Sequence, residues 1–203
     1  MSTQPKSFLT PEQYLEIERK AAYKSEYYRG EMFAMSGARL AHNLIVANLI
    51  SQAVPQLRSG PCSILPSDMR VQVTSTGLYT YPDASVVCGQ AKLADGQMDT
   101  LLNPAVLFEV LSPSTEAYDR GAKFKHYQTI ASLKQYVLIA SDYTQVDLYT
   151  RQPDDSWLFR TASYPDDIVE LQSIDCRLKL ADLYEKIVSR TEPGPAIRRS
   201  NAE

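Results

Sequence analysis

The stretch Leu107–Thr115, LFEVLSPST, is the most informative part of the sequence for the fold. It is an apolar run that contains one carboxylate. A short apolar run with β-branched residues is typical of a strand that is buried on both faces, and the Ser112-Pro113 step ends it. Glu109 stands in the middle of this run. An unpaired carboxylate in such a place costs several kcal/mol or takes up a proton. The sequence therefore predicts a buried strand in which Glu109 has a partner.

A second buried-strand pattern, Tyr81–Gly89 (YPDASVVCG), carries another carboxylate, Asp83. Neighbouring strands lie about 4.8 Å apart, so Asp83 and Glu109 at matching heights would both reach one ion. Mg²⁺ suits such a place because it binds one or two carboxylates and keeps several waters. The alternative is structural: Asp83 caps a turn after Pro82, and Glu109 pairs with an arginine.

The segment Thr115–Ser132 has a helical pattern apart from Gly121 and follows directly after the Glu109 strand. Asp119 and Lys123 are four residues apart in it. If Lys123 points to the strand ends, its ammonium stabilises charge on a phosphate or orients an attacking water. The alternative is an ordinary Asp–Lys pair on a helix surface.

Upstream of these elements, Thr10 to Gln13 form a capping box with proline at the first helical position, which predicts a helix to about Ala22. Two short strands flank a turn at Arg29-Gly30. The longest helical pattern is Ala41–Gly60, in which Pro55 should bend or shorten the last turns. Asp68–Val73 alternates in polarity and predicts a half-buried strand with Arg70 on its polar side.

Downstream, four strand patterns and a closing helix complete one mixed α/β domain. The strands are Leu133–Ala140, Gln145–Gln152, Ser156–Tyr164 and Asp167–Ile174, and the helix is Leu180–Arg190. We expect a single domain over residues 10–190, a flexible segment at 1–9 and a disordered tail at 191–203.

Composition narrows the function classes. The 203 residues are 44% hydrophobic and 22% charged, as in globular proteins, and the net charge of −3 disfavours a coating of nucleic acid through bulk positive charge. We expect no secretory signal, because the first residues contain no apolar run, and no membrane span, because the longest apolar windows are too short to cross a bilayer. The three cysteines, Cys62, Cys88 and Cys176, are widely spaced, so we expect reduced thiols in apolar surroundings and a cytoplasmic protein.

Taken together, several of these stretches resemble the Uma-two family (domain of unknown function 820), a restriction-endonuclease-like branch of the PD-(D/E)XK nuclease superfamily. The resemblance runs from about Pro11 to Leu183 and is strongest in LFEVLSPSTEAYDRGAKFKHY. It extends to YPDASVV, LKQYVLIA, YYRGEMFAMSG, HN and PSDMRV. It implies an α/β fold with a restriction-endonuclease-like core, in which a central mixed β-sheet is flanked by helices.

The resemblance also implies site residues. Asp83 matches the PD element and Glu109 the acidic residue of the second element, so both would be metal ligands, with the backbone carbonyl of Val110 as a further oxygen. The sequence departs from the superfamily pattern at Leu111, where the lysine belongs. Lys123 in the next helix matches that lysine.

Other matches carry less weight. Lys125 is the second candidate for the displaced lysine. Glu31 and His42 match recurrent family positions, and either Glu31 or Glu26 would supply an additional acidic group. For His42 the alternative is a helix-start histidine that makes a local hydrogen bond.

The function implied by the resemblance is hydrolysis of DNA phosphodiester bonds by an endonuclease that uses Mg²⁺, with Mn²⁺ as a substitute. DNA, a divalent ion and a second copy of the chain would be its partners, because cutting two strands suits a symmetric dimer. The alternative is a catalytically inactive nucleic-acid-binding or interaction module that retains the fold. Leu111 and the lack of a basic patch favour that alternative.

Overall fold

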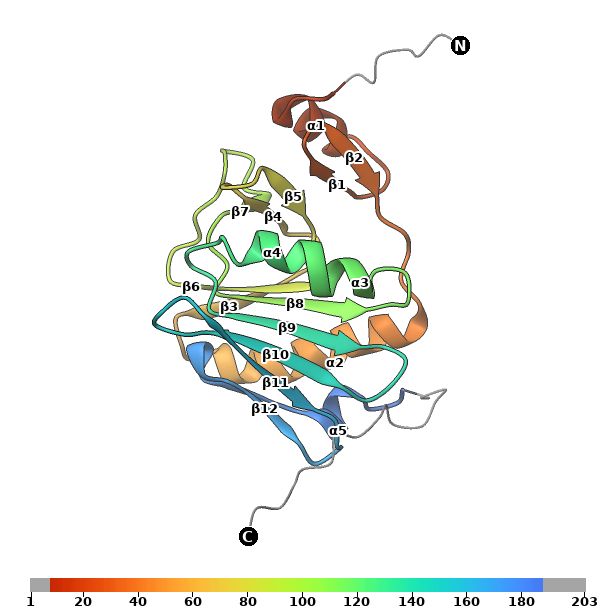
Figure 1. Ribbon diagram of the computed structural model, residues 1–203, viewed down its shortest axis with the longest axis vertical. Helices are drawn as coiled ribbons and strands as arrows, with labels where there is room; N and C mark the ends of the chain where they lie inside the picture. The colour runs from red at the N-terminus through yellow and green to blue at the C-terminus, as the bar shows by residue number, and fades with distance from the viewer. Residues whose placement is uncertain (1–7, 188–203) are drawn as a thin grey trace.

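The fold is built on a central six-stranded sheet, shown in a computed structural model that describes residues 8–187 (Figure 1). The predictions for residues 1–7 and for the tail at 191–203 lie outside the described residues. The order of the strands is β11-β10-β9-β8-β6-β3, and only the β8–β9 pair is parallel. In chain order the strands are β3 Cys62–Pro66, β6 Ala84–Cys88, β8 Val106–Leu111, β9 Gln135–Ala140, β10 Val146–Arg151 and β11 Trp157–Ala162.

Side chains of β8 alternate between two separate cores, one on each face of this sheet. Val106, Phe108 and Val110 pack into the core under the long helix α2, Leu40–Leu57. Leu107 and Leu111 pack into the core on the opposite face. Because side chains in a strand alternate with a period of two, Glu109 shares the face of Leu107 and Leu111.

The face of the sheet that carries Glu109 is covered by a broken helix after β8. Its parts are α3 Glu116–Tyr118, a π-helical turn Asp119–Lys123 and α4 Phe124–Tyr127. In Figure 1 this helix lies in front of the sheet and α2 lies behind it. The central sheet is thus sandwiched between helices, as predicted, and α/β is the correct fold class.

The N-terminal elements form a second, five-stranded sheet with the order β2-β1-β5-β4-β7, above the first in Figure 1. Helix α1 packs beside it. The elements are α1 Pro11–Glu18, β1 Ser25–Tyr28, β2 Glu31–Ala34, β4 Arg70–Val73, β5 Leu78–Thr80 and β7 Thr100–Leu101. The β1–β2 hairpin turns at Arg29-Gly30, as predicted, and both residues have positive φ.

The chain closes with a two-stranded ribbon and a short helix. They are β12 Ile168–Leu171, a 3₁₀ turn Gln172–Ile174, β13 Cys176–Lys179 and α5 Leu180–Leu183. The ribbon and α5 pack against α2. None of the helices among residues 8–187 has the length and apolar character that a membrane crossing requires.

Several sequence-based boundaries were wrong. The first helix ends at Glu18, short of Ala22, because the Glu18 carboxylate accepts a hydrogen bond from the backbone of Ser25 where β1 begins. The closing helix spans only Leu180–Leu183, and its predicted end at 188–190 lies outside the described residues. Strands β5, β7 and β13 were not predicted. These strands are two to four residues long, too short to establish a periodic pattern.

Arg70 was also misplaced by the sequence pattern, because it is buried and not on a polar surface. Its guanidinium donates to the Tyr81 and Thr100 hydroxyls and pairs with Asp99 at 2.9 Å. A buried charge is tolerated when it is paired and hydrogen-bonded, and a strand pattern cannot reveal partners distant in sequence.

The prediction of three reduced cysteines is wrong for two of them. Cys62 in β3 stands directly opposite Cys88 in β6, and the two form a disulfide. The spacing along the sequence gave no sign of this, because only the register between the two strands brings the thiols together. Cys176 is a free, buried cysteine, as predicted. The cytoplasmic location stays a prediction.

Reduction of this disulfide is expected to lower the thermal midpoint. The two cysteines are 26 residues apart, and a crosslink of that span contributes about 3 kcal/mol by restricting the unfolded chain. In a chain of this size that is a shift of roughly 6–12 °C. Thermal melts with and without dithiothreitol measure it, and a Cys62→Ser/Cys88→Ser double variant should melt at the lower temperature in both. Equal midpoints for the oxidised and reduced protein would contradict the expectation.

Candidate active site

Asp83 and Glu109 meet where β6 and β8 pair. Ala84, the first residue of β6, stands opposite Phe108 in β8, so Asp83 lies just before the paired residues, at the end of the ladder next to Glu109. The backbone N–H of Val110 donates to Asp83 Oδ2 at 2.7 Å, which fixes the carboxylate beside β8. The two predicted carboxylates therefore lie close together, Asp83 just before β6 and Glu109 within β8.

Glu109 is 4% exposed and has two partners on a single oxygen. The Tyr127 hydroxyl donates to Glu109 Oε1 at 2.8 Å, and the Lys123 ammonium lies 2.9 Å from the same atom. The partners of Glu109 are thus Lys123 and Tyr127 of the broken helix, and not an arginine.

Lys123, also 4% exposed, is the centre of the cluster. Besides Glu109, its ammonium lies 3.1 Å from Glu26 Oε1 and 3.4 Å from Asp119 Oδ1. Asp119 and Lys123 are therefore no surface pair, because both are buried. The Thr80 hydroxyl donates to Glu26 and holds that carboxylate over the site.

The π-helical turn Asp119–Lys123 explains how the helix delivers this lysine. A π turn is wider than an α turn and breaks the regular backbone ladder, and such turns are frequent at functional sites. The Tyr136 hydroxyl donates to the backbone carbonyl of Asp119 at 3.1 Å. Arg120, which lies 2.7 Å from Glu116 and 2.5 Å from Asp147, anchors the turn from its outer side. The contacts of Tyr136 and Arg120 together hold the turn so that Asp119 and Lys123 face inward.

Leu111 occupies the position at which the sequence resemblance would place a lysine. Its side chain is buried in the core that also contains Leu107 and Tyr127, directly below the broken helix. A lysine at this position would have to enter that apolar core. Lys123 approaches Glu109 from the covering helix and brings an ammonium to the same face of the sheet.

The electrostatics of the cluster leave an excess of negative charge. Burial raises the pKa of Glu109 well above its usual value, and the Asp119 and Asp83 carboxylates raise it further against the effect of Lys123. Burial alone would lower the pKa of Lys123, but Glu109, Glu26 and Asp119 raise it well above its usual value. One ammonium thus faces three carboxylates, with Asp83 close by.

This donor set fits a divalent cation. Asp83 and Glu109 supply two carboxylates, which is the number Mg²⁺ uses when waters complete its shell. Among residues 8–187, no three acidic, histidine or cysteine side chains are arranged as a complete metal cage. A site with two carboxylates agrees with both observations.

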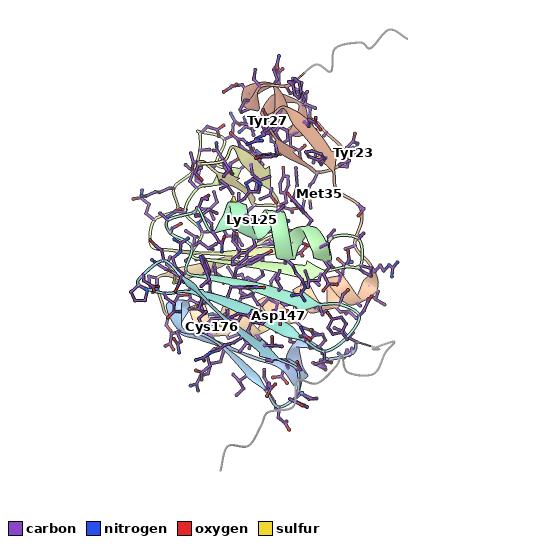
Figure 2. The ribbon with its side chains drawn as sticks, in the orientation of Figure 1. Tyr23, Tyr27, Met35, Lys125, Asp147 and Cys176 are labelled. Atoms are coloured by element: carbon purple, nitrogen blue, oxygen red, sulfur yellow. A yellow bond between two sulfur atoms is a disulfide. The ribbon has the colours of Figure 1, made fainter. Side chains whose placement is uncertain are left out.

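The other predicted residues lie at different distances from this centre. The His42 imidazole, near the start of α2, lies with Nε2 3.1 Å from Asp83 Oδ1. His42 therefore contacts a residue of the site that is distant in sequence, and the alternative of a local hydrogen bond at the helix start is not what the structure has. Glu26, not Glu31, makes the contact with Lys123. Glu31 begins β2 and pairs with Tyr28 across the hairpin. Lys125 is exposed on α4; Figure 2 labels it.

Two tyrosines of the site were not predicted. Tyr127 holds Glu109, and Tyr118 contacts both Glu26 and Lys123, with its ring centroid 5.7 Å from the ammonium. In a chain with thirteen tyrosines neither stands out by composition. A signal was present in the spacing: Lys123 and Tyr127 are four residues apart, so both face the sheet once the helix is placed over Glu109.

The chain is similar to several known proteins. Residues 11–181 match the model of the Uma2 family, described as "Putative restriction endonuclease". Two Synechocystis proteins are similar to the chain. One, slr1290, is 38% identical over 176 residues. The match covers 87% of this chain and 91% of the length of slr1290. The other, sll1609, is 34% identical over 150 residues, 74% of this chain and 85% of its own.

A solved structure shares the fold. It is the crystal structure of an Anabaena variabilis protein described as "a putative nuclease belonging to DUF820". The TM-score is 0.72 and the identity 19%, and the match covers 89% of this chain and 99% of that chain. At this identity the likeness establishes the fold alone.

Proposed function

We propose that this chain, which belongs to the Uma2 family, is a metal-dependent endonuclease of the PD-(D/E)XK type that hydrolyses DNA phosphodiester bonds. The observation that carries the proposal is the position of the Lys123 ammonium, 2.9 Å from Glu109 in a site that also contains Asp83. That contact supplies the lysine that is missing at Leu111. It favours an active enzyme over a module that kept only the fold.

Asp83 and Glu109 are proposed to hold Mg²⁺, or Mn²⁺ as a substitute. When bound, the ion polarises the scissile phosphate and lowers the pKa of a bound water. Val110 has a backbone role here, since its N–H orients Asp83, and its carbonyl is the further oxygen implied by the family pattern. His42 holds the other oxygen of Asp83 and so fixes the direction of that carboxylate.

Lys123 is proposed to stabilise the negative charge that develops on the phosphate and to position the attacking water. Its pKa is raised by three carboxylates, so it stays protonated at neutral pH and acts as a donor, not as a base. Glu26 and Asp119 hold the ammonium in place through their own contacts. Lys125 and Glu31 have no part in this proposal.

Cleavage of plasmid DNA tests the function. Wild-type protein is incubated with supercoiled plasmid in Mg²⁺, in Mn²⁺ and in EDTA, beside an Asp83→Asn variant. We expect nicked and linear products only with a divalent ion and only with the wild-type protein. Products that persist in EDTA or with Asp83→Asn would refute the assignment of the site, and binding without any cleavage would favour the inactive module.

Replacement of Tyr127 by phenylalanine is expected to weaken metal binding about 10-fold without unfolding the protein. The hydroxyl fixes Glu109 through a buried hydrogen bond, and partners of metal ligands typically contribute a 10- to 100-fold effect. Titration calorimetry with Mn²⁺ measures the affinity, and a thermal melt checks the fold. A Tyr164→Phe variant, in which an exposed tyrosine that follows β11 loses its hydroxyl, is the control. An unchanged Mn²⁺ affinity in Tyr127→Phe would contradict the positioning role.

A symmetric homodimer belongs to this proposal, because one active centre cuts one strand and a duplex has two. Sedimentation equilibrium with and without duplex DNA tests it. A monomer under both conditions would remove the dimer from the proposal and leave the active centre untouched.

A further inference from the structure

The β1–β2 hairpin presents one face to the active site. Glu26 pairs across the hairpin with Phe33, and Tyr28 pairs with Glu31, so all four side chains point to the same side. Two contacts identify that side. Glu26 reaches Lys123 at 3.1 Å, and the Tyr28 ring lies edge-on to His126 of α4 at 4.8 Å between centroids. Phe33 therefore stands beside Glu26 on the face turned toward the site.

Phe33 and Tyr118 flank Glu26 and keep much of their surface in solvent. Phe33 is 50% exposed and Tyr118 is 37% exposed. Tyr118 hydrogen-bonds to Glu26 from the broken helix, whereas Phe33 neighbours it on the hairpin. Two rings from different elements thus border the same carboxylate at the edge of the buried cluster. In Figure 2, Met35, which follows β2 and is also exposed, lies between the hairpin and α4.

Positive charge lies on the same border. Arg29, at the hairpin turn, is exposed, and its guanidinium lies 5.1 Å from the centre of the Tyr28 ring. Exposed rings beside an arginine are typical of proteins that hold single-stranded nucleic acid, since bases stack on the rings and a phosphate meets the cation.

We propose that Phe33 and Tyr118 form a stacking platform for unpaired bases next to the scissile phosphate, so that the preferred substrate is DNA with a single-stranded segment. This inference rests on the proposed nuclease function and specifies its substrate. Bases inside a duplex are stacked on each other and offer no free face to a ring.

Binding is measured separately from cleavage, by fluorescence anisotropy in EDTA with a labelled 20-nucleotide single strand and the matching duplex. Wild-type protein should bind the single strand at least about 10-fold more tightly than the duplex. Phe33→Ala should reduce this single-strand affinity about 10-fold and leave the duplex affinity unchanged. The matched control is Phe159→Ala, since Phe159 is 51% exposed on β11, at the opposite edge of the central sheet.

Tyr118 is tested by two variants, because its hydroxyl also contacts Glu26. Tyr118→Phe keeps the ring and should retain single-strand affinity, whereas Tyr118→Ala should lose it to the same extent as Phe33→Ala. Equal wild-type affinities for single strand and duplex, or a Phe33→Ala variant that binds like Phe159→Ala, would overturn the platform. Cleavage of plasmid by the same proteins then distinguishes a failure of the stacking platform from a failure of the proposed nuclease function. If the platform fails while plasmid is still cut, the nuclease function stands, and if no substrate is cut while Phe33 still governs binding, only the nuclease function fails.

Discussion

Lys123→Met is expected to reduce Mg²⁺-dependent cleavage by at least roughly 100-fold, the loss seen when a single charge-stabilising donor is removed from an active site. Methionine keeps most of the length and apolar volume of lysine but has no ammonium. The contacts to Glu109, Glu26 and Asp119 all disappear with it. The defect should lie in the chemical step, which single-turnover cleavage with saturating protein measures.

The same substitution should destabilise the metal-free protein by about 3–5 kcal/mol, because it leaves buried carboxylates without their cation. Urea unfolding at pH 7 measures this loss in the free energy of unfolding. At pH 5 the loss should be smaller, because the carboxyl groups take up protons. Lys125→Met, a change of the same residue type on the exposed side of α4, is the control and should be neutral in both assays. A Lys123→Met protein that is fully active would remove Lys123 from the site.

Glu109→Gln is expected to have opposite effects on activity and on stability. Loss of a carboxylate that is proposed to hold the metal should abolish cleavage, with a reduction of roughly 1000-fold or more. The metal-free protein should become more stable by roughly 1–3 kcal/mol at pH 7, because one of three buried carboxylates around a single lysine is gone. Glutamine retains an oxygen that accepts from the Tyr127 hydroxyl.

The pH dependence of this gain has a definite sign. Since the folded protein raises the pKa of Glu109 above the ordinary value of 4.5, it holds a proton that the unfolded chain releases. Wild-type stability therefore falls as pH rises from about 4.5 through the folded pKa, and the gap to Glu109→Gln widens over that range. Urea unfolding of both proteins from pH 4 to pH 8 in EDTA measures it. Glu170→Gln, at an exposed ion pair on β12, is the control. A gap that narrows with rising pH would contradict the electrostatic description of the site.

The sequence was sufficient for the two strands and their carboxylates. Asp83 and Glu109 stand out because each is a charge inside an apolar strand, and two such strands separated by a loop have few ways to pair. The antiparallel register then brings Asp83 to the end of the ladder, next to Glu109. The spacing of Lys123 after Glu109 located the lysine only with the help of the family resemblance, because an i, i+4 pair with Asp119 looks the same on a surface helix.

Other parts of the site depend on contacts that no local pattern contains. Glu26 reaches Lys123 because the β1–β2 hairpin folds over a helix that begins some ninety positions later in the chain, and the sequence offered Glu31 as an equal candidate. The π turn arises from tertiary contacts of Tyr136 and Arg120, which override the α-helical pattern of this segment. The disulfide has the same origin, since Cys62 and Cys88 meet only through strand register.

The central claim is that Asp83 and Glu109 hold a divalent ion beside Lys123. A crystal of the wild-type protein soaked in Mn²⁺, with data collected at the manganese absorption edge, tests it most directly. We predict one anomalous difference peak within about 2.5 Å of a carboxylate oxygen of both Asp83 and Glu109, and no peak there in a Glu109→Gln crystal soaked in the same way. A wild-type crystal with well-ordered Asp83 and Glu109 and no peak between them, at a Mn²⁺ concentration that supports cleavage in solution, would contradict the claim.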